Sequence, residues 1–414
     1  PATSVDLGGG GAWLPWILLA VEELYQHARW RWIALGSLFI ALQLLAGEPQ
    51  MNCYTIIVVG AYGLFSLLFR PARETRLHFL LGSLAMAICG LLISMIQLLP
   101  ERELLNQGER ASINYDYFAQ FSFPPRQVFA LLAPYFFGGA ALDPYRVPYW
   151  GQWNISETCG YTGMLALLLA LVAIVAQRRD RLTIFWVFIA LLALTLSFGG
   201  YLPFGIHRML HHVPVYNLFR APGRHMLEFT LAIGILAGRG LTALYTAERK
   251  TALRAVLFSS ALIALAMTAT AIVYVYYDKA LVTEIPLPEV ASSIKNPDIY
   301  IPIICCAVSL ILLWLTFALG KRAVWMPALL VLALFLDLAS FGFFFEWRLT
   351  KYNIPEKLAD SPIVKFIKER EPDWHAFRMI SHSPYPFSYN TDLINYPNTS
   401  IVRGLDRKST RLNS

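Results

Sequence analysis

The stretch that decides the fold runs from Val213 to Leu241 and reads VPVYNLFRAPGRHMLEFTLAIGILAGRGL. An aromatic and basic loop comes first, and a Pro-Gly-Arg turn ending at Arg224 follows it. The rest of the stretch is apolar and has about the length, roughly 20 residues, that a helix needs to cross a bilayer. Because proline fits the first turn of a helix, where its missing N–H costs nothing, the stretch predicts a membrane helix that begins near Pro222.

This helix start also predicts an anion site. The first turn of a helix carries free N–H groups and the positive end of the helix dipole, and here it also carries Arg224, with Arg220 just before it. Phosphate is the anion that we expect at this position. Glu228 is one turn below Arg224, so the two side chains are expected to pair. Further along, Gly234 and Gly238 predict a face for close helix packing.

Composition sets the class of protein. Of the 414 residues, 57% are hydrophobic and 15% are charged, whereas soluble domains carry about 25% charged residues. The net charge of +7 does not indicate nucleic acid as a partner, because much of the Lys and Arg lies in short clusters between apolar runs, where orientation signals belong. The cysteines show no metal-ligand spacing. The chain is therefore predicted to be a multi-span membrane protein.

The predicted fold is an all-α bundle of about ten spans that occupies residues 12–345. The spans are apolar runs close to the length that a bilayer requires. They are Ala12–Gln26, Trp32–Ala46, Met51–Phe69, Leu77–Leu99, Tyr161–Ala176, Leu182–Phe198, His225–Leu244, Ala252–Tyr277, Ile299–Leu319 and Ala323–Phe345.

The loops between these runs predict the orientation. Short basic loops at 29–31, 70–76, 178–181, 249–254 and 321–322 all fall on one side, which is expected to be the cytoplasm. The long loops 100–160, 199–224 and 278–298, with the C-terminal segment, then fall on the outer face.

Both ends of the chain are expected to be incomplete. Residues 346–405 read as the beginning of a soluble extracytoplasmic domain. Residues 406–414, DRKSTRLNS, resemble one reading frame of a sequencing adaptor, and we assign them no functional role.

The outer loop 100–160 contains RQVFALLAPYFF, which begins at Arg126 and is too short to span the membrane. We predict an amphipathic helix here. One interpretation is a helix in the membrane interface that forms part of a lipid-headgroup groove. The other is a helix packed over the mouth of the bundle. The carboxylates of this loop, Glu101, Glu103, Glu109 and Asp116, are candidates for a general base or for solvated surface groups.

Three further features could support a site. Glu48 lies in an outer turn, GEPQ, and could also be a simple turn carboxylate. Asp337 is an ionisable group within the tenth run, with either a functional or a structural hydrogen-bonding role. His207 and His211 are four residues apart, which permits joint metal binding. No carboxylate stands at a matching offset and no HExxH is present, so no metal site is assigned.

Several stretches in this order resemble the YfhO-type bacterial membrane proteins, which belong to the GT-C class of glycosyltransferases. These stretches are RWRW with ALQLLAGEPQ, QLLPERELLNQGER with LLAPYFFGG, the stretch 213–241, FLDLASF and NYPNTSIVRGLD. The resemblance covers nearly the whole chain.

The resemblance implies a protein of the bacterial cytoplasmic membrane that transfers a sugar from a polyprenyl-phosphate carrier to an outer-face envelope glycan or glycolipid. In that class the catalytic carboxylate usually lies in the first outer loop, so we leave it unassigned and expect this chain alone to be inactive. For the carrier phosphate we expect Arg220 and Arg224, with Arg110 and Arg126 as weaker candidates. Glu228, Glu48 and Asp337 are the expected supporting residues. No cofactor is assigned, and a divalent metal stays open. A lipid-carrier transporter or flippase and a non-catalytic protein of envelope assembly are the alternatives.

Overall fold

The computed structural model describes residues 9–70, 76–107, 114–138, 149, 151–153, 155–276, 297–342 and 369–370. The chain divides into two units, Pro1–Trp347 and Arg348–Ser414. Nearly all described residues belong to the first unit. The segment predicted as an outer domain, 346–405, lies outside the described residues except for residues 369–370.

Every regular element among the described residues is a helix. Each of the apolar runs found in the sequence coincides with one of the longer helices. These are α2 (Leu14–His27), α3 (Trp30–Leu45), α4 (Pro49–Phe69), α5 (Arg76–Gln107), α7 (Met164–Ala176), α8 (Arg181–Ser197), α10 (Met226–Thr246), α11 (Arg249–Tyr276), α12 (Pro297–Leu319) and α13 (Met326–Gly342). Two short helices, α6 (Tyr115–Phe118) and α9 (Ile206–Leu210), lie in the loops.

Five of the described helices are long and apolar enough to cross a membrane. They cover Pro49–Phe69, Arg76–Glu103, Pro222–Thr246, Arg249–Val275 and Asp298–Arg322. The chain is therefore a membrane protein, and the regular elements of its described part are all helices. Four of the other helices are apolar but shorter than 18 residues, so the number of about ten spans stays a prediction.

Helix α7 is the centre of the main core. Its residues Met164, Leu168 and Val172 are completely buried, and it packs against α10, α11, α12, α8 and α13. The approach of α10 depends on Gly240, because a Cβ at this position would lie 1.8 Å from the carbonyl oxygen of Leu169. The sequence assigned close packing to Gly234 and Gly238 instead. That assignment is wrong, since added Cβ atoms there would meet nothing within 4 Å.

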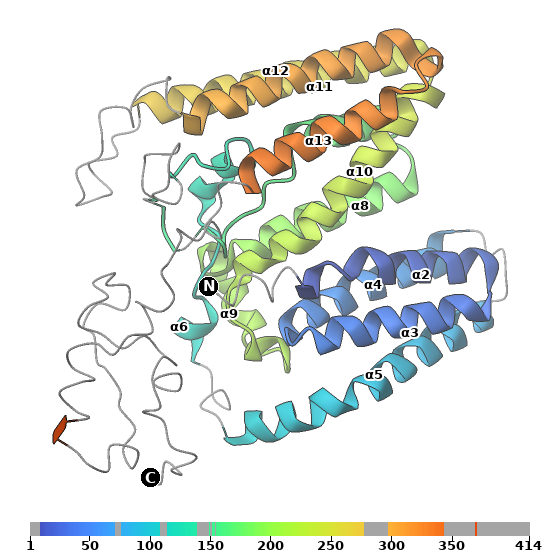
Figure 1. Cartoon of the computed structure of the whole chain (residues 1–414), viewed down its shortest axis with the longest axis vertical. Coiled ribbons are helices and arrows are strands. Elements are labelled where there is room, and N and C mark those ends of the chain that lie inside the picture. The colour runs from blue at the N-terminus through green and yellow to red at the C-terminus, as the bar shows by residue number, and fades with distance from the viewer. Residues whose placement is uncertain are drawn as a thin grey trace. The chain divides into compact units, whose positions relative to one another are not determined.

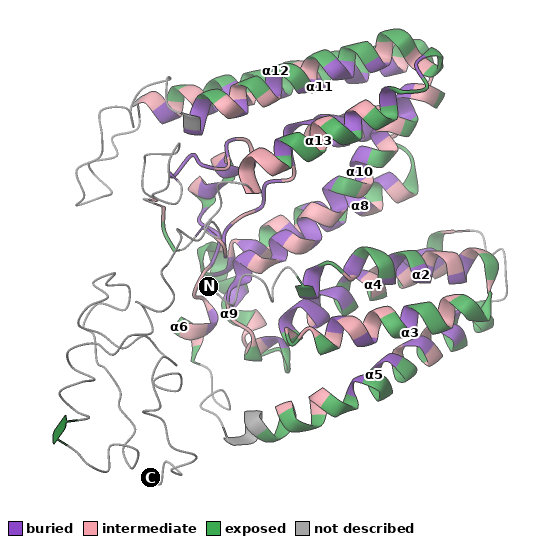
Figure 2. Ribbon diagram, in the orientation of Figure 1, coloured by how far each residue is buried: buried purple, intermediate pink, exposed green. Residues whose placement is uncertain are grey.

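Helices α2 to α5 form a second group, in which α3 packs against α5 and α2 packs against α3. Large apolar side chains on the outer side of α5 are exposed, including Leu92 and Ile96, which is 80% exposed. Figure 2 shows exposed stripes of this kind along α5 and α12. Exposed apolar stripes on helices of spanning length are expected where lipid, rather than water, covers the protein.

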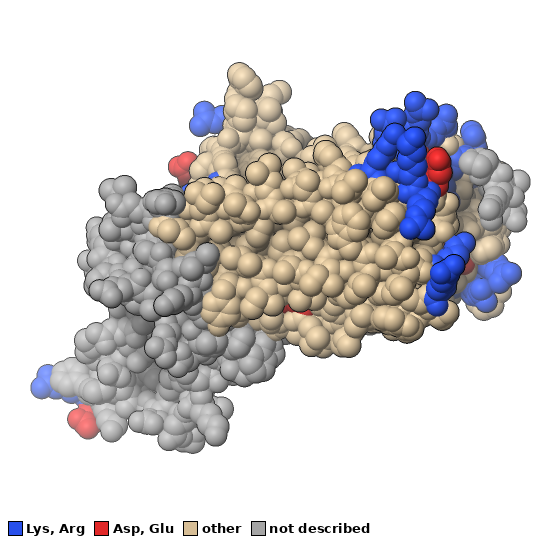
Figure 3. Space-filling model, turned by 90° about the horizontal axis from the view of Figure 1, so that it is seen from above, with Lys and Arg blue, Asp and Glu red and all other residues tan. Residues whose placement is uncertain are grey.

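The short basic turns gather at one end of these helices. Figure 1 shows the turns from α2 to α3 and from α12 to α13 at that end, and α6 and α9 lie near the opposite end. In the space-filling view most of the visible Lys and Arg side chains cluster at one end beside a broad uncharged surface (Figure 3). Ion pairs join several elements there: Arg70 bonds Glu22 at 2.6 Å, and Arg239 bonds Asp180 at 2.6 Å. The sequence pattern of basic turns thus corresponds to one end of the bundle.

Candidate functional site

The candidate site lies where the loops meet the start of α10, opposite the basic turns. A short 3-10 helix, Pro222–His225, leads into α10, and Ala221 before it has a φ of 63°. The turn is fixed by its backbone: the Gly223 N–H donates to the Phe121 carbonyl at 3.1 Å and the Arg224 N–H to the Ala221 carbonyl at 3.0 Å. The expectation of free N–H groups for an anion is therefore wrong for Gly223 and Arg224.

The guanidinium of Arg224 is surrounded by acceptors. Its Nε and Nη2 donate to the two carboxylate oxygens of Glu157 at 2.7 and 2.8 Å. Its Nη1 donates to Gln50 Oε1 at 2.9 Å and lies 3.7 Å from a carboxylate oxygen of Glu48. The side chains of Arg224 and Glu157 are only 11% and 9% exposed, so this is a nearly buried, bidentate ion pair. The expected pair between Arg224 and Glu228 does not form.

Glu228 pairs with a histidine instead. Its Oε1 lies 2.9 Å from His225 Nδ1, and the other ring nitrogen of His225 lies 2.6 Å from the hydroxyl of Tyr216. The Tyr54 ring stacks on the His225 ring with centroids 4.0 Å apart. Both His225 and Glu228 are buried, and burial together with the Glu228 charge raises the pKa of Tyr216 above its usual range. This group forms a polar layer beneath Arg224.

Gln50 connects the two layers. Its Oε1 accepts from Arg224, while its Nε2 donates to the Tyr54 hydroxyl at 2.7 Å and to the Arg220 carbonyl at 2.6 Å. A neutral amide is suited to this position because it accepts from a cation on one side and donates on the other. Glu48, the residue before α4, and Gln50, in the first turn of α4, are thus brought to the start of α10.

Arg220 has a different environment from Arg224. Its guanidinium carbon lies 5.1 Å from the ring centre of Tyr117 and 5.4 Å from that of Phe121. Among the described residues, no carboxylate lies within ion-pair distance of Arg220, and its side chain is half-buried. A guanidinium held on aromatic faces keeps its N–H edges available for an anion. Arg220 is therefore the arginine of the expected pair that has no ion pair with a described carboxylate.

The other expected residues are placed separately. Arg126 is half-buried, at the second position of the 3-10 helix Pro125–Leu131. Arg110 lies outside the described residues. Asp337 is on α13, where it accepts from the Tyr161 hydroxyl at 2.6 Å and from the Met164 N–H at 2.8 Å. Asp337 thus caps the first turn of α7. Of the two roles considered for Asp337, functional and structural, these hydrogen bonds correspond to the structural one.

The segment that follows Arg126 is not a helix lying freely in the interface. Residues 125–131 form a 3-10 helix, and Ala133, Phe136 and Phe137 after it are buried in the main core. Gln127 within it is also buried. Of the two interpretations, packing over the mouth of the bundle describes this segment.

His207 and His211 form an aromatic cluster rather than a metal site. The Phe118 ring stacks on His207 with centroids 4.5 Å apart, and the Tyr115 hydroxyl lies 3.2 Å from His207 Nδ1. Burial, followed by the nearby His225 and His211, lowers the pKa of His207 to about 4, so this ring is neutral at pH 7. Within the part of the chain that the structure describes, no group of three or more His, Cys, Asp or Glu side chains could hold a metal ion.

Sequence reasoning missed Glu157, which is the main partner of Arg224. It lies in a loop with no helical periodicity, 67 residues before Arg224, so its partner could not be found from spacing. Compared with known protein families, with curated proteins and with solved structures, the chain shows no significant match.

Proposed function

We propose that this protein is a membrane glycosyltransferase of the GT-C type, related to the YfhO-type proteins, that takes a sugar from a polyprenyl-phosphate carrier. The acceptor in this proposal is an outer-face envelope glycan or glycolipid. The observation that carries the proposal is the state of Arg220: a half-buried guanidinium, held on two aromatic rings, with no described carboxylate partner, beside a cluster of carboxylates.

The two arginines have separate roles in this proposal. Arg220 binds the carrier phosphate, since a free guanidinium edge can make two parallel charged hydrogen bonds to phosphate oxygens. Arg224 already donates hydrogen bonds to Glu157 and Gln50. It is a positioning residue that fixes Glu157 and keeps Gln50 oriented. This division replaces the sequence expectation that both arginines contact the phosphate.

In this proposal a carboxylate of the site activates the hydroxyl group of the sugar acceptor. Glu157 is held bidentately, whereas Glu48 lies farther from Arg224, at 3.7 Å, and its side chain is 19% exposed. A partly accessible carboxylate near a cation is a candidate to receive a proton from an acceptor hydroxyl. Among the described residues we assign this role to Glu48.

The proposed orientation follows from charge. The basic turns belong in the cytoplasm by the positive-inside rule, which puts the start of α10, Glu48 and Glu157 on the outer face. About ten spans and an extracytoplasmic segment 346–405 belong to the same proposal, in a bacterial cytoplasmic membrane. A lipid-linked sugar would then reach the site from the outer leaflet.

The test compares Arg220→Ala with Arg208→Ala. Arg208 is a matched control because its guanidinium also lies over a ring, that of Tyr115 at 4.9 Å, but its side chain is exposed. We expect Arg220→Ala in the full-length protein to weaken carrier binding about tenfold or more, since a hydrogen bond to a charged group contributes about 1.5–3 kcal/mol. Sugar transfer should fall with it, and Arg208→Ala should change neither.

The outcome that overturns the proposal is unchanged transfer of sugar from the polyprenyl phosphate in Arg220→Ala. Carrier movement between leaflets without any sugar transfer would instead identify the lipid-carrier flippase. Binding of the carrier with neither activity would leave a non-catalytic membrane protein of envelope assembly.

A further inference from the structure

A concentration of exposed apolar side chains lies in the loop that leads from α8 to α10. We call residues 204–218 the apolar loop. Its exposed apolar residues are Phe204, Ile206, Met209, Val213, Val215 and Leu218. Phe204 is 95% exposed and Val215 is 60% exposed. Single exposed apolar residues are ordinary on a protein surface, but a group of them marks a contact with another molecule or with a membrane.

The backbone of the apolar loop is strained at two of these residues. Phe204 has a φ of 60° and Val215 has a φ of 70°, in the left-handed region that residues other than glycine rarely adopt. Such a conformation persists only where the surrounding structure enforces it. Here His207 and Tyr216, close to the two strained residues, are buried and anchor the loop. The loop is therefore held in a shape in which Phe204 and Val215 stay uncovered.

The apolar loop lies at the level where two spanning helices begin. Leu210, at the end of α9, and Leu227, in the first turn of α10, both pack against one small cluster. The cluster consists of Met51, Tyr54, Phe118 and Tyr216, and Met51 belongs to the first turn of α4. Both α4 and α10 have spanning length, and such a helix begins near the boundary between lipid headgroups and hydrocarbon. The apolar loop therefore lies at the depth of this boundary.

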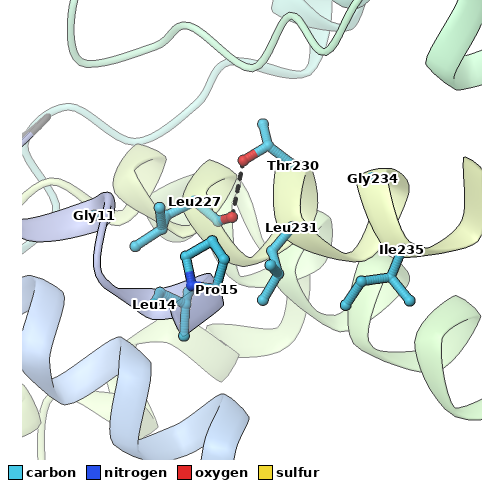
Figure 4. A pocket seen from close by; sticks show the side chains of 8 residues that line it. All are labelled: Gly11, Leu14, Pro15, Leu227, Thr230, Leu231, Gly234 and Ile235. Atoms are coloured by element: carbon cyan, nitrogen blue, oxygen red, sulfur yellow. Dashed lines mark hydrogen bonds between the residues drawn. The ribbon is translucent and has the colours of Figure 1, made fainter. Parts of the chain in front are cut away.

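The surface of α10 becomes apolar close to the start of the helix. A hollow of about 370 Å³ between α10 and the start of α2 has walls that include Leu14, Pro15, Leu227, Leu231 and Ile235 (Figure 4). Thr230 also lines it, and its hydroxyl donates to the Leu227 carbonyl at 2.9 Å. A hollow with apolar walls suits hydrocarbon rather than water. Because Arg224 lies in the polar cluster three residues before Leu227, the polar boundary passes between these two residues, beside the apolar loop.

The charge of this part of the chain suits phospholipid headgroups. Residues 199–224 include three arginines and three histidines but no aspartate or glutamate. Headgroup phosphates are negative, and segments that combine basic with apolar side chains bind at the surface of a membrane. A soluble protein could reach the apolar loop only by displacing the lipid around the starts of α4 and α10.

We infer that the apolar loop is inserted into the interface of the bilayer, with Phe204, Met209 and Val215 at the boundary between headgroups and acyl chains. This contact goes beyond the proposed function, because it depends on the position of the loop beside two spanning helices and not on sugar transfer. Arg220 is two residues after Leu218, so insertion of the loop also holds the candidate site at the lipid surface.

The experiment places a photoreactive probe at the most exposed apolar position of the loop. Phe204 is replaced by p-benzoylphenylalanine, which also has an aromatic ring and forms a covalent bond with nearby C–H groups under light. The full chain is reconstituted in nanodiscs of phosphatidylethanolamine and phosphatidylglycerol, irradiated, and weighed intact by mass spectrometry. We expect a mass increase equal to one phospholipid. Fragmentation of the adduct should place the new bond on the glycerol or on the upper part of an acyl chain.

Two other positions of the probe are the controls. Phe258 is an exposed residue of the spanning helix α11, and a probe there should give a lipid adduct. Asp116, on the neighbouring short helix α6, is exposed, and a charged side chain is unfavourable in lipid, so a probe there should stay in water. The adduct yield at position 204 should exceed that at position 116 about tenfold or more, the equivalent of about 1.4 kcal/mol. Thermal melting in detergent shows whether each variant is folded, and Met209 takes the probe if the variant at position 204 is not.

Two results would overturn the inference. One is a folded variant at position 204 that gives no lipid adduct while the variant at position 258 gives one. The other is a bond from position 204 to a second copy of the chain or to another part of the same chain, which would show that protein covers the loop. Failure of the proposed function is distinguishable, since the lipid adduct is expected whether or not the protein transfers sugar.

Discussion

Arg224 and Glu157 form a bidentate ion pair that joins the 3-10 turn before α10 to a loop 67 residues earlier in the chain. Both side chains are nearly buried. The pair therefore fixes the loop against the turn that leads into α10 and, through Gln50, the first turn of α4 as well. Three segments that are distant in sequence are positioned by one guanidinium.

Because of this pair, the single variant Glu157→Leu is expected to be less stable than a double variant that replaces both residues. Glu157→Leu leaves a nearly buried cation with fewer partners, and breaking a buried pair by removing one partner costs about 3–5 kcal/mol. Replacing both residues, as in Glu157→Leu/Arg224→Met, removes the stranded charge, so the double variant should be more stable than Glu157→Leu. Melting temperature in detergent checks this order. If the double variant loses the sum of the two single losses, the pair is not the source of the effect.

Two glycines on α10 predict opposite effects of the same substitution. Gly240→Ala would place a Cβ 1.8 Å from the Leu169 carbonyl oxygen, so α10 must move away from α7 and stability should fall. At Gly238 the space is open, and alanine should stabilise the helix by up to about 1 kcal/mol through its higher helix propensity. Thermal melting of the two variants side by side is the measurement. Equal effects would mean that the close approach at Gly240 is not needed.

These glycines also show what a single sequence can and cannot predict. The apolar runs predicted the helices, because length and hydropathy are local properties. The choice between Gly234, Gly238 and Gly240 depends on how α10 is rotated against α7. That rotation is set by the contacts between the two helices, which are not a local property of the α10 sequence.

The site was predictable to a similar extent. Arg220, Arg224 and Glu48 were found because each lies next to a helix start or turn in the sequence. Glu157 and Gln50 were not assigned a role, since their contacts with Arg224 span 67 and 174 residues. The pairing of Arg224 with Glu228 was expected from helical spacing. It failed because Arg224 belongs to the 3-10 turn before α10, where its side chain points toward the loops, and because His225 takes Glu228.

Asp337→Asn is predicted to destabilise the protein although it changes few atoms. Asp337 accepts from both the Tyr161 hydroxyl and the Met164 N–H. An asparagine has one acceptor oxygen, so its NH₂ group must face one of these donors, and an unsatisfied buried donor costs about 1–3 kcal/mol. Asp116→Asn, at an exposed position, is the control and should leave the melting temperature unchanged. A loss of sugar transfer without a loss of stability in Asp337→Asn would contradict the structural role.

The neutral His207 predicts a stability loss in acid. Its folded-state pKa is lowered to about 4 by burial and by the nearby His225 and His211, whereas an unfolded histidine has a pKa of about 6.5. Below pH 6.5 the unfolded chain therefore binds a proton that the folded chain does not, and the free energy of unfolding falls until the pH reaches about 4. Above pH 6.5 both states are neutral and the residue contributes no pH dependence. A full shift of this size corresponds to at most about 3 kcal/mol.

The measurement is the melting temperature in detergent between pH 7.5 and 4, with His207→Gln as the comparison. Glutamine does not titrate, so the variant should start less stable, because it loses the stacking on Phe118, but should lose less stability on acidification. His212→Gln is the control, since His212 is exposed, and its pH profile should match that of the unaltered protein. Ion-paired carboxylates also lose stabilisation in acid, and they do so equally in all three proteins. The difference between the two pH profiles therefore reports the contribution of His207. If His207→Gln and the unaltered protein have identical profiles, the His207 ring takes up a proton as easily in the folded state as in the unfolded state, and the prediction is wrong.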